Sequence, residues 1–300
     1  MGSKRKGIKI FLGVIFCKMS LEYRTQEFGE EFTEDHRVYI TQDGKIISPF
    51  HDIEIYPTDS EKIVNVVNEI PRFTNAKLEI NKEEKMNPIK QDTKNGKVRF
   101  ITNVFPKKGY IWNYGAIPQT WESTEVEDKL VGCKGDNDPI DAIEIGSATK
   151  RTGEVYRAKI LGGIAMIDGG ECDWKILVID TADEMSKTLN DIEDVKKNMP
   201  GFLEETREWF RNYKMPAGSP PNKFACNEEY IDSNKASEIV KETHAYWKKL
   251  VQEKEHEGIS LANTSQKGTP GHTSEFKAEG PEFKSRKEPK EAQGFYFLKE

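Results

Sequence analysis

The strand signals of this chain lie in one part of the sequence and the helix signals in another. Within residues 37–145, short β-branched and aromatic runs alternate with turn residues, and two further apolar runs follow at 160–167 and 176–179. The sequence at 42–44 is typical of a hairpin turn, and the glycine pair at 162–163 indicates a bend or bulge within a strand. These signals predict that strands dominate the first two thirds of the chain.

Helical periodicity begins near Pro200, which suits the first position of a helix. Apolar residues then follow at spacings of 3, 4 and 3, and a second helical pattern covers about 235–255. The first pattern comprises Leu203, Thr206, Phe210 and Tyr213; the second comprises Ala236, Val240, Trp247, Leu250 and Val251. We therefore predict an α+β fold, in which a closed or nearly closed β-barrel has helices from the C-terminal third packed on it.

The composition changes beyond Gly258, where Pro, Gly, Ser, Lys and Glu dominate. A segment of this kind buries too little apolar surface to fold alone. We expect an N-terminal extension over residues 1–35, a globular domain over 36–257 and a polar tail over 258–300, with the aromatic triplet at 295–297 as a candidate to dock on the core.

The charge balance and the dispersed cysteines exclude several classes of protein. The formal net charge is −6 and the isoelectric point about 5.6, so no basic surface for nucleic acid is predicted. The four cysteines form no CxxC pair, and the five histidines are not clustered. We expect reduced thiols and no histidine-based zinc site.

The first 18 residues place four basic side chains before the apolar run 10–17. A signal peptide has this shape, but an A-x-A-like cleavage site is missing, and the run is too short to span a bilayer. We expect a cytoplasmic protein without a membrane segment. The alternative is a mitochondrial protein, with these residues as a targeting peptide and Met19 as a second possible start.

An acidic loop, Gly135-Asp136-Asn137-Asp138-Pro139-Ile140-Asp141, has the strongest chemical signal. Carboxylates at i and i+2 of an extended chain point the same way, and they repel unless they are protonated or bind cations. All-oxygen ligation suits Mg²⁺ or Ca²⁺. An EF-hand starting at Asp136 would need Gly and Glu where Asp141 and Ser147 stand. Alone, this loop is also compatible with a solvated turn.

Two more acidic groups and a set of cations and tyrosines accompany the loop. The acids are Asp168, Glu171 and Asp173 in one group, and Glu69 and Glu79 in the other; the second set comprises Lys77, Arg99, Lys175, Lys214, Tyr110 and Tyr114. Separately these are an ordinary hairpin turn, an amphipathic strand, a helix end and core tyrosines. Together they suit phosphoryl transfer, because carboxylates hold metals and cations hold phosphate oxygens. The Gly-rich phosphate-binding motifs and the Gly-x-Ser-x-Gly motif are missing from the sequence.

Several segments resemble the soluble family I inorganic pyrophosphatases, in the same order along the chain. They are 135–141, 71–80, 113–121, 173–175 and 190–195. The similarity extends from about Arg37 to Gln252 and is close to the fungal and animal branch. Gly169 stands where many relatives carry an acid, and Phe73 replaces a more usual Trp.

This resemblance implies a closed OB-like β-barrel, a homodimer, several Mg²⁺ ions and hydrolysis of pyrophosphate to two phosphates. It assigns metal binding to Asp136, Asp141, Asp173, Asp168, Glu171, Glu69 and Glu79, the last two directly or through water. It assigns phosphate contacts to Lys77, Arg99, Tyr114, Lys175, Tyr213 and Lys214. Asp138 would deprotonate the attacking water, and Tyr110 would donate a proton near the leaving group.

Two other functions stay open. One is a catalytically weak relative that serves as a binding subunit and reaches a partner with its tail. The other is a broader phosphoanhydride hydrolase that acts on polyphosphate or nucleotides, although no nucleoside-binding motif favours it.

Overall fold

A computed structural model describes residues 22–298 of the chain. Residues 1–18, which would be a targeting peptide under the mitochondrial alternative, and Cys17 among them lie outside the described residues. Cys133, Cys172 and Cys226 are free thiols. Over the described part of the chain, no helix is long and apolar enough to cross a membrane.

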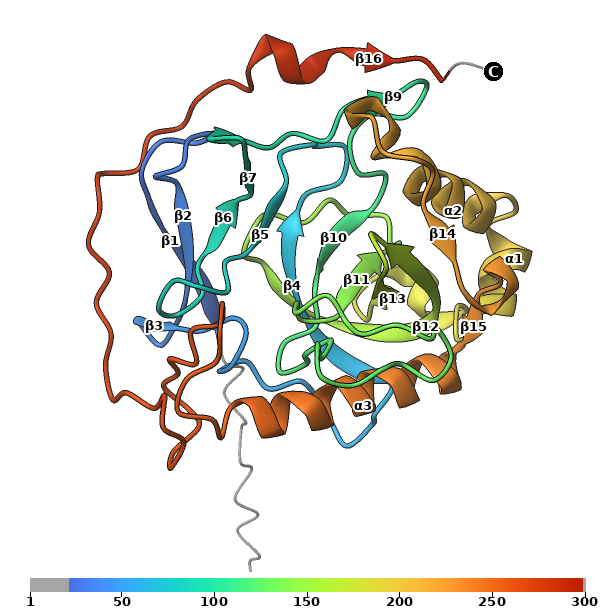
Figure 1. Ribbon diagram of the computed structural model, residues 1–300. Helices are drawn as coiled ribbons and strands as arrows, with labels where there is room; N and C mark the ends of the chain where they lie inside the picture. The colour runs from blue at the N-terminus through green and yellow to red at the C-terminus, as the bar shows by residue number, and fades with distance from the viewer. Residues whose placement is uncertain (1–21, 299–300) are drawn as a thin grey trace, which may run out of the picture.

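The described chain is mostly β-structure with three α-helices (Figure 1). The helices are α1 (Ile192–Asn198), α2 (Phe202–Asn212) and α3 (Ser233–Leu250). The strands are β1 (Tyr23–Phe28), β2 (Arg37–Gln42), β3 (Lys45–Ile47), β4 (Ile63–Ile70), β5 (Leu78–Ile80), β6 (Ile89–Gln91), β7 (Thr93–Lys94), β8 (Lys97–Val98), β9 (Asn103–Val104), β10 (Asn113–Ala116), β11 (Asp141–Glu144), β12 (Val155–Asp168), β13 (Glu171–Asp180), β14 (Lys223–Phe224), β15 (Ile231–Asp232) and β16 (Phe295–Tyr296).

Five strands pair in a closed ring, in the order β4, β12, β13, β11, β10 and back to β4. The β11–β13 pairing is parallel, and the other four are antiparallel. Apolar side chains of these strands are almost all buried, with Val66, Ile143, Ile164 and Ile176 at 0% exposure. The predicted dominance of strands is confirmed, and the ring is the part of the fold that organises the site.

Glycines shape the longest hairpin of the ring, formed by β12 and β13. Gly169 and Gly170 make its turn with φ of 63° and 99°, a region that glycine enters at little cost. The register shifts between Ile160 and Gly162, which confirms the irregularity predicted at the 162–163 glycine pair. This turn places Asp168 and Glu171 opposite each other, at one end of the ring.

A second sheet packs beside the ring and contains β1, β2, β6 and β5, with β3 paired to β2. The predicted turn at 42–44 joins β2 to β3, where Asp43 and Gly44 both have positive φ, as a type I′ hairpin turn requires. Strand β5 lies at the end of this sheet and leads into the site.

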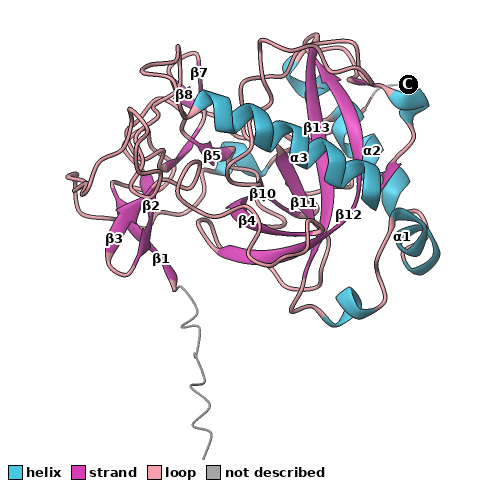
Figure 2. Ribbon diagram, turned by 90° about the horizontal axis from the view of Figure 1, so that it is seen from below, coloured by secondary structure: helices cyan, strands magenta, loops and turns pink. Residues whose placement is uncertain are grey.

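The two predicted helices are confirmed with adjusted bounds, but Pro200 is not the first residue of a helix. Gly201 (φ 82°) precedes α2 and turns the chain between α1 and α2, so the helix begins at Phe202. The buried face of α2 also includes Trp209, which the predicted apolar spacing did not include. Helix α1 was not predicted. Helix α3 packs against β12 and crosses the ring in Figure 2.

After α3, the chain returns along the β1–β2 sheet and ends beside β9 (Figure 1). Ile259 and Leu261 are buried, and Asp52 accepts hydrogen bonds from the backbone and hydroxyl groups of Thr264 and Ser265. Strand β16 pairs in parallel with β9. The tail is therefore held along much of its length, while the predicted division of the chain at residues 35 and 257 stays a prediction.

Candidate active site

One cavity of about 370 Å³ opens at the end of the ring and collects all fifteen predicted site residues. Beyond those residues, its wall includes Leu78, Ile80, Ala116, Pro139, Gly169 and Phe210. The first group comes from β4, from β5 and from the residue directly before β5, and comprises Glu69, Glu79 and Lys77. The loops after β5 supply Arg99 and Tyr110, and β10, the acidic loop and β11 supply Tyr114, Asp136, Asp138 and Asp141. The β12–β13 hairpin supplies Asp168, Glu171, Asp173 and Lys175, and the residues after α2 are Tyr213 and Lys214. Residues distant in sequence thus meet in one place.

The parallel pairing of β11 with β13 brings the central charges together. It sets Asp141 opposite Lys175, and Asp173, two residues earlier on β13, faces the same side. The Lys175 ammonium pairs with both carboxylates and donates to the Tyr114 hydroxyl at 3.0 Å. Burial opposes the charge, but the attraction of Asp141 and Asp173 raises the pKa of Lys175 well above its usual range. Lys175 is therefore a buried, permanent cation.

The acidic loop is held by a hydrogen bond of its own and by one from Trp121. The backbone N–H of Asp138 donates to Asp136 Oδ1 at 3.0 Å, and Trp121 Nε1 donates to Asn137 Oδ1 at 2.9 Å. Asn137 has a positive φ of 72°, a conformation that Asn tolerates better than most residues. The loop therefore presents Asp136 and Asp138 in a defined arrangement.

Glu122, Asp136 and Asp173 form a compact carboxylate group whose ligand atoms lie within 4.8 Å of one another. Burial, together with the negative charges of neighbouring aspartates, raises the pKa values of Asp136 and Glu122 well above their usual range. Burial raises the pKa of Asp173 to about 7, although Lys175 opposes the shift. Glu122 Oε1 accepts from the Trp174 backbone N–H, but Oε2 is buried without a hydrogen-bond partner. An oxygen-only group with surplus negative charge and an unpaired oxygen fits a hard divalent cation.

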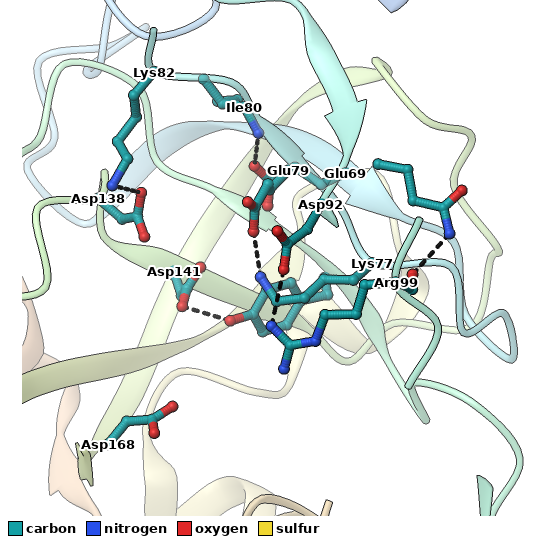
Figure 3. Close-up of polar contacts among 12 residues, drawn as sticks. Glu69, Lys77, Glu79, Ile80, Lys82, Asp92, Arg99, Asp138, Asp141 and Asp168 are labelled. Atoms are coloured by element: carbon teal, nitrogen blue, oxygen red, sulfur yellow. Dashed lines mark hydrogen bonds and ion pairs between the residues drawn. The ribbon is translucent and has the colours of Figure 1, made fainter. Parts of the chain in front are cut away.

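The opposite wall of the cavity combines cations with acids from β5 and its neighbours (Figure 3). Lys77 pairs with Glu79, and the Ile80 N–H donates to Glu69 Oε1 at 2.7 Å. Burial and the charge of Asp141 raise the pKa of Glu69 well above its usual range. Burial opposes the charge of Lys77, but Glu79 and Tyr110 raise its pKa well above the usual range. This wall therefore holds the positive charge of Lys77, which can bind an anion, next to the carboxyl groups of Glu69 and Glu79.

The end of α2 brings Tyr213 and Lys214 to the cavity. Lys214 pairs with Asp168, and the Tyr213 hydroxyl donates to the same carboxylate oxygen at 3.2 Å. The Trp209 ring stacks on Tyr213 at 5.1 Å between centroids and contacts Tyr110 at 4.8 Å. Helix packing thus fixes the position of these phenol groups.

The two tyrosines of the 110–114 segment differ in their partners. The Tyr114 hydroxyl donates to Asp141 Oδ2 at 2.5 Å. Tyr110 is buried against Trp112 and Trp209, and burial raises its pKa to about 12. A phenol with this pKa keeps its proton at neutral pH, as a proton donor must.

Three polar residues at the site were not predicted from the sequence. Glu122 belongs to the carboxylate group, Asp92 pairs with Arg99 at 2.9 Å, and Lys82 pairs with Asp138 at 2.8 Å. Glu122 directly follows the segment 113–121 that resembles the pyrophosphatases, so its position was a usable signal. Asp92 and Lys82 lie in polar stretches without a distinguishing pattern. The roles assigned to the fifteen predicted residues stay predictions.

Comparison with known proteins identifies the family. The family model described as inorganic pyrophosphatase matches residues 66–248. The inorganic pyrophosphatase of the fungus Emericella nidulans is 50% identical over 246 residues, covering 82% of this chain and 86% of the relative, and that of Bos taurus is 50% identical over 250 residues, covering 83% and 86%. The inorganic pyrophosphatase structure from Schistosoma japonicum has a TM-score of 0.86 and 44% identity, and covers 92% of this chain and 100% of its own. Sequence and fold agree, and the chain belongs to the family I inorganic pyrophosphatases, close to fungal and animal members.

Proposed function

We propose that this protein hydrolyses inorganic pyrophosphate to two phosphates with Mg²⁺ as its metal. The observation that carries this proposal is the cavity itself, where seven carboxylates assigned to metals face six groups assigned to phosphate. A small dianionic or more highly charged substrate and its cations need both sets within one enclosed space. Membership in the pyrophosphatase family supports pyrophosphate as that substrate.

The proposed metal ligands are the acids at the ring end and in the hairpin turn. Asp136, Asp141 and Asp173 would hold a first ion, with Asp141 shared by a second; Asp168, Glu171, Glu69 and Glu79 would hold further ions directly or through water. Bound Mg²⁺ would supply positive charge, which would lower the pKa of a bound water below the value of about 15.7 in bulk water and would offset charge on phosphate. Glu122 would support this set, because one of its carboxylate oxygens lies within 4.8 Å of those of Asp136 and Asp173 and its buried Oε2 has no hydrogen-bond partner.

The protein groups then perform the proton transfers and hold the phosphates. Asp138 accepts a proton from the attacking water, whose oxygen forms a bond to one phosphorus while the bridging P–O bond breaks. Tyr110 donates its proton toward the leaving phosphate. Phosphate oxygens are held by Lys77, Arg99, Tyr114, Lys175, Tyr213 and Lys214.

The direct test is phosphate release from pyrophosphate against Mg²⁺, with a chelator to remove the metal and Ca²⁺ as a challenge. Asp138→Ala should fold and bind metal but lose about 10²- to 10⁴-fold in kcat, the usual contribution of a general base. Asp59→Ala, at an exposed carboxylate that does not line the cavity, is the matched control. Full activity in Asp138→Ala would remove Asp138 from this role. Faster turnover of tripolyphosphate or ATP than of pyrophosphate would overturn the substrate assignment.

We further infer a homodimer, a closed OB-like barrel for the five-strand ring, and a cytoplasmic location, with a mitochondrial one as the alternative. For the homodimer, an exposed aromatic patch supplies support: Phe105 stacks on Phe297 at 5.0 Å and contacts Phe295 at 6.1 Å, and all three rings are at least 44% exposed. Phe297→Ser should shift the mass measured by light scattering from dimer toward monomer, whereas Leu130→Ser, at a comparably exposed site, should not. A monomeric wild type would refute the dimer.

A further inference from the structure

Lys82 approaches the proposed base from outside the cavity. Its ammonium lies 2.8 Å from Asp138 Oδ1, and Figure 3 shows the two side chains meeting end to end. The lysine stands two residues after β5, and the aspartate belongs to the acidic loop. Within residues 22–298, Asp138 forms no other ion pair.

The backbone of Lys82 is held from two directions. Its carbonyl accepts from the Ser260 N–H at 2.7 Å and from Asn87 Nδ2 at 3.0 Å. Asn87 is fully buried, and its own Oδ1 accepts from Ser48 Oγ at 2.7 Å. These hydrogen bonds hold the backbone from which the Lys82 side chain extends toward Asp138.

The placement of Lys82 differs from that of the other cations near the site. Lys77, Arg99, Lys175 and Lys214 all line the cavity and can reach an anion within it. Lys82 lines the neighbouring groove instead, with Arg37 and Lys90. From there it contacts Asp138 without facing the space where phosphate would lie.

We propose that Lys82 is a positioning residue that fixes the Asp138 carboxylate for proton transfer. The proposal rests on the base role proposed for Asp138. That carboxylate is 43% exposed, so little packing restrains it, and the charged hydrogen bond from Lys82 supplies the restraint. Half-exposed ion pairs add little to folding stability, whereas a small displacement of a reacting group costs up to about 100-fold in rate.

The test compares Lys82→Met with Lys82→Arg, which keeps the charge and can reach the same carboxylate. Lys90→Met is the matched control, because Lys90 lines the same groove but pairs with Glu84. Each variant is assayed for kcat and KM with pyrophosphate at saturating Mg²⁺, for melting temperature, and for Mg²⁺ binding by calorimetry. Lys82→Met should lower kcat about 10- to 100-fold with KM, Mg²⁺ affinity and melting temperature nearly unchanged, and Lys82→Arg should recover most of the loss.

A double-mutant cycle with Asp138→Ala decides whether Lys82 acts through the base. In the Asp138→Ala background, Lys82→Met should cause no further loss of kcat. A full additional loss there, an effect confined to KM, or a lowered melting temperature would each overturn the positioning role. Failure of the base assignment appears separately, as full activity of Asp138→Ala alone.

Discussion

His51 should make the protein less stable in mild acid. The ring is fully buried, with Nδ1 3.0 Å from Trp247 Nε1 and Nε2 3.0 Å from the Ser260 carbonyl oxygen. Indole N–H can only donate and a carbonyl can only accept, so these partners require a neutral imidazole with its proton on Nε2. If His51 were protonated at Nδ1 as well, its Nδ1–H and the Trp247 Nε1–H would both be donors, and this hydrogen bond would be lost.

The size of the effect follows from the shift in the pKa of His51. Burial lowers it from 6.5 to about 4, although the Ser260 carbonyl and the charge of Asp52 oppose the shift. Between pH 6.5 and about pH 4, His51 is protonated in the unfolded chain but neutral in the folded protein. The free energy of unfolding therefore falls as the pH drops below 6.5. The full difference corresponds to about 3 kcal/mol, of which about 2 kcal/mol should be lost between about pH 7.5 and pH 5.

Urea unfolding at a series of pH values measures this loss, with His51→Gln as the comparison. Glutamine can accept from Trp247 and donate to Ser260 but does not titrate. The wild type should therefore lose about 2 kcal/mol more than His51→Gln over that range. His272→Gln, at a partly exposed histidine, should retain the wild-type pH dependence. Parallel curves for wild type and His51→Gln would refute the reasoning.

Three further substitutions test the site and its support. Arg99→Ala should lower kcat/KM about 10- to 100-fold by removing a charged hydrogen bond to phosphate, and unchanged kinetics would remove Arg99 from the site. Trp112→Ala should cost about 3–5 kcal/mol in urea unfolding, because the indole is fully buried and stacks on Phe210; a loss below about 1 kcal/mol would contradict that packing. Gly115→Ala would place Cβ 2.0 Å from the Val67 carbonyl oxygen, so the ring must shift at a cost of about 1–3 kcal/mol, and a wild-type melting temperature would show that it does not.

The sequence predicted most of the cavity because its residues stand in short segments with ordered motifs. The acidic loop alone indicated only an acidic turn or a metal site, and the ordered segments that resemble the pyrophosphatases then assigned Asp136, Asp141 and Lys175 to the site. Lys82 could not be predicted, since its contact with Asp138 depends on how the end of β5 is oriented by the rest of the fold.

Local periodicity likewise predicts elements better than their connections. The helical spacing found α2 and α3, but Gly201 moved the start of α2 past Pro200 because the chain must turn there from α1. Neither the spacing nor the composition indicated that Ser260 would hydrogen-bond to the 82–87 loop, a contact between residues far apart in the chain.

The parallel pairing of β11 with β13 also affects how this molecule folds, because it joins residues that are far apart in the chain. Asp141 and Lys175 become neighbours only when β13 pairs with β11, and β12 also pairs with β4, about 90 residues earlier in the chain. Contacts of such sequence separation form slowly, because the loop entropy is lost before the contact forms. The ligands drawn from both strands of this pairing therefore meet only as the ring closes. Mg²⁺ should consequently slow unfolding more than it accelerates the early steps of folding.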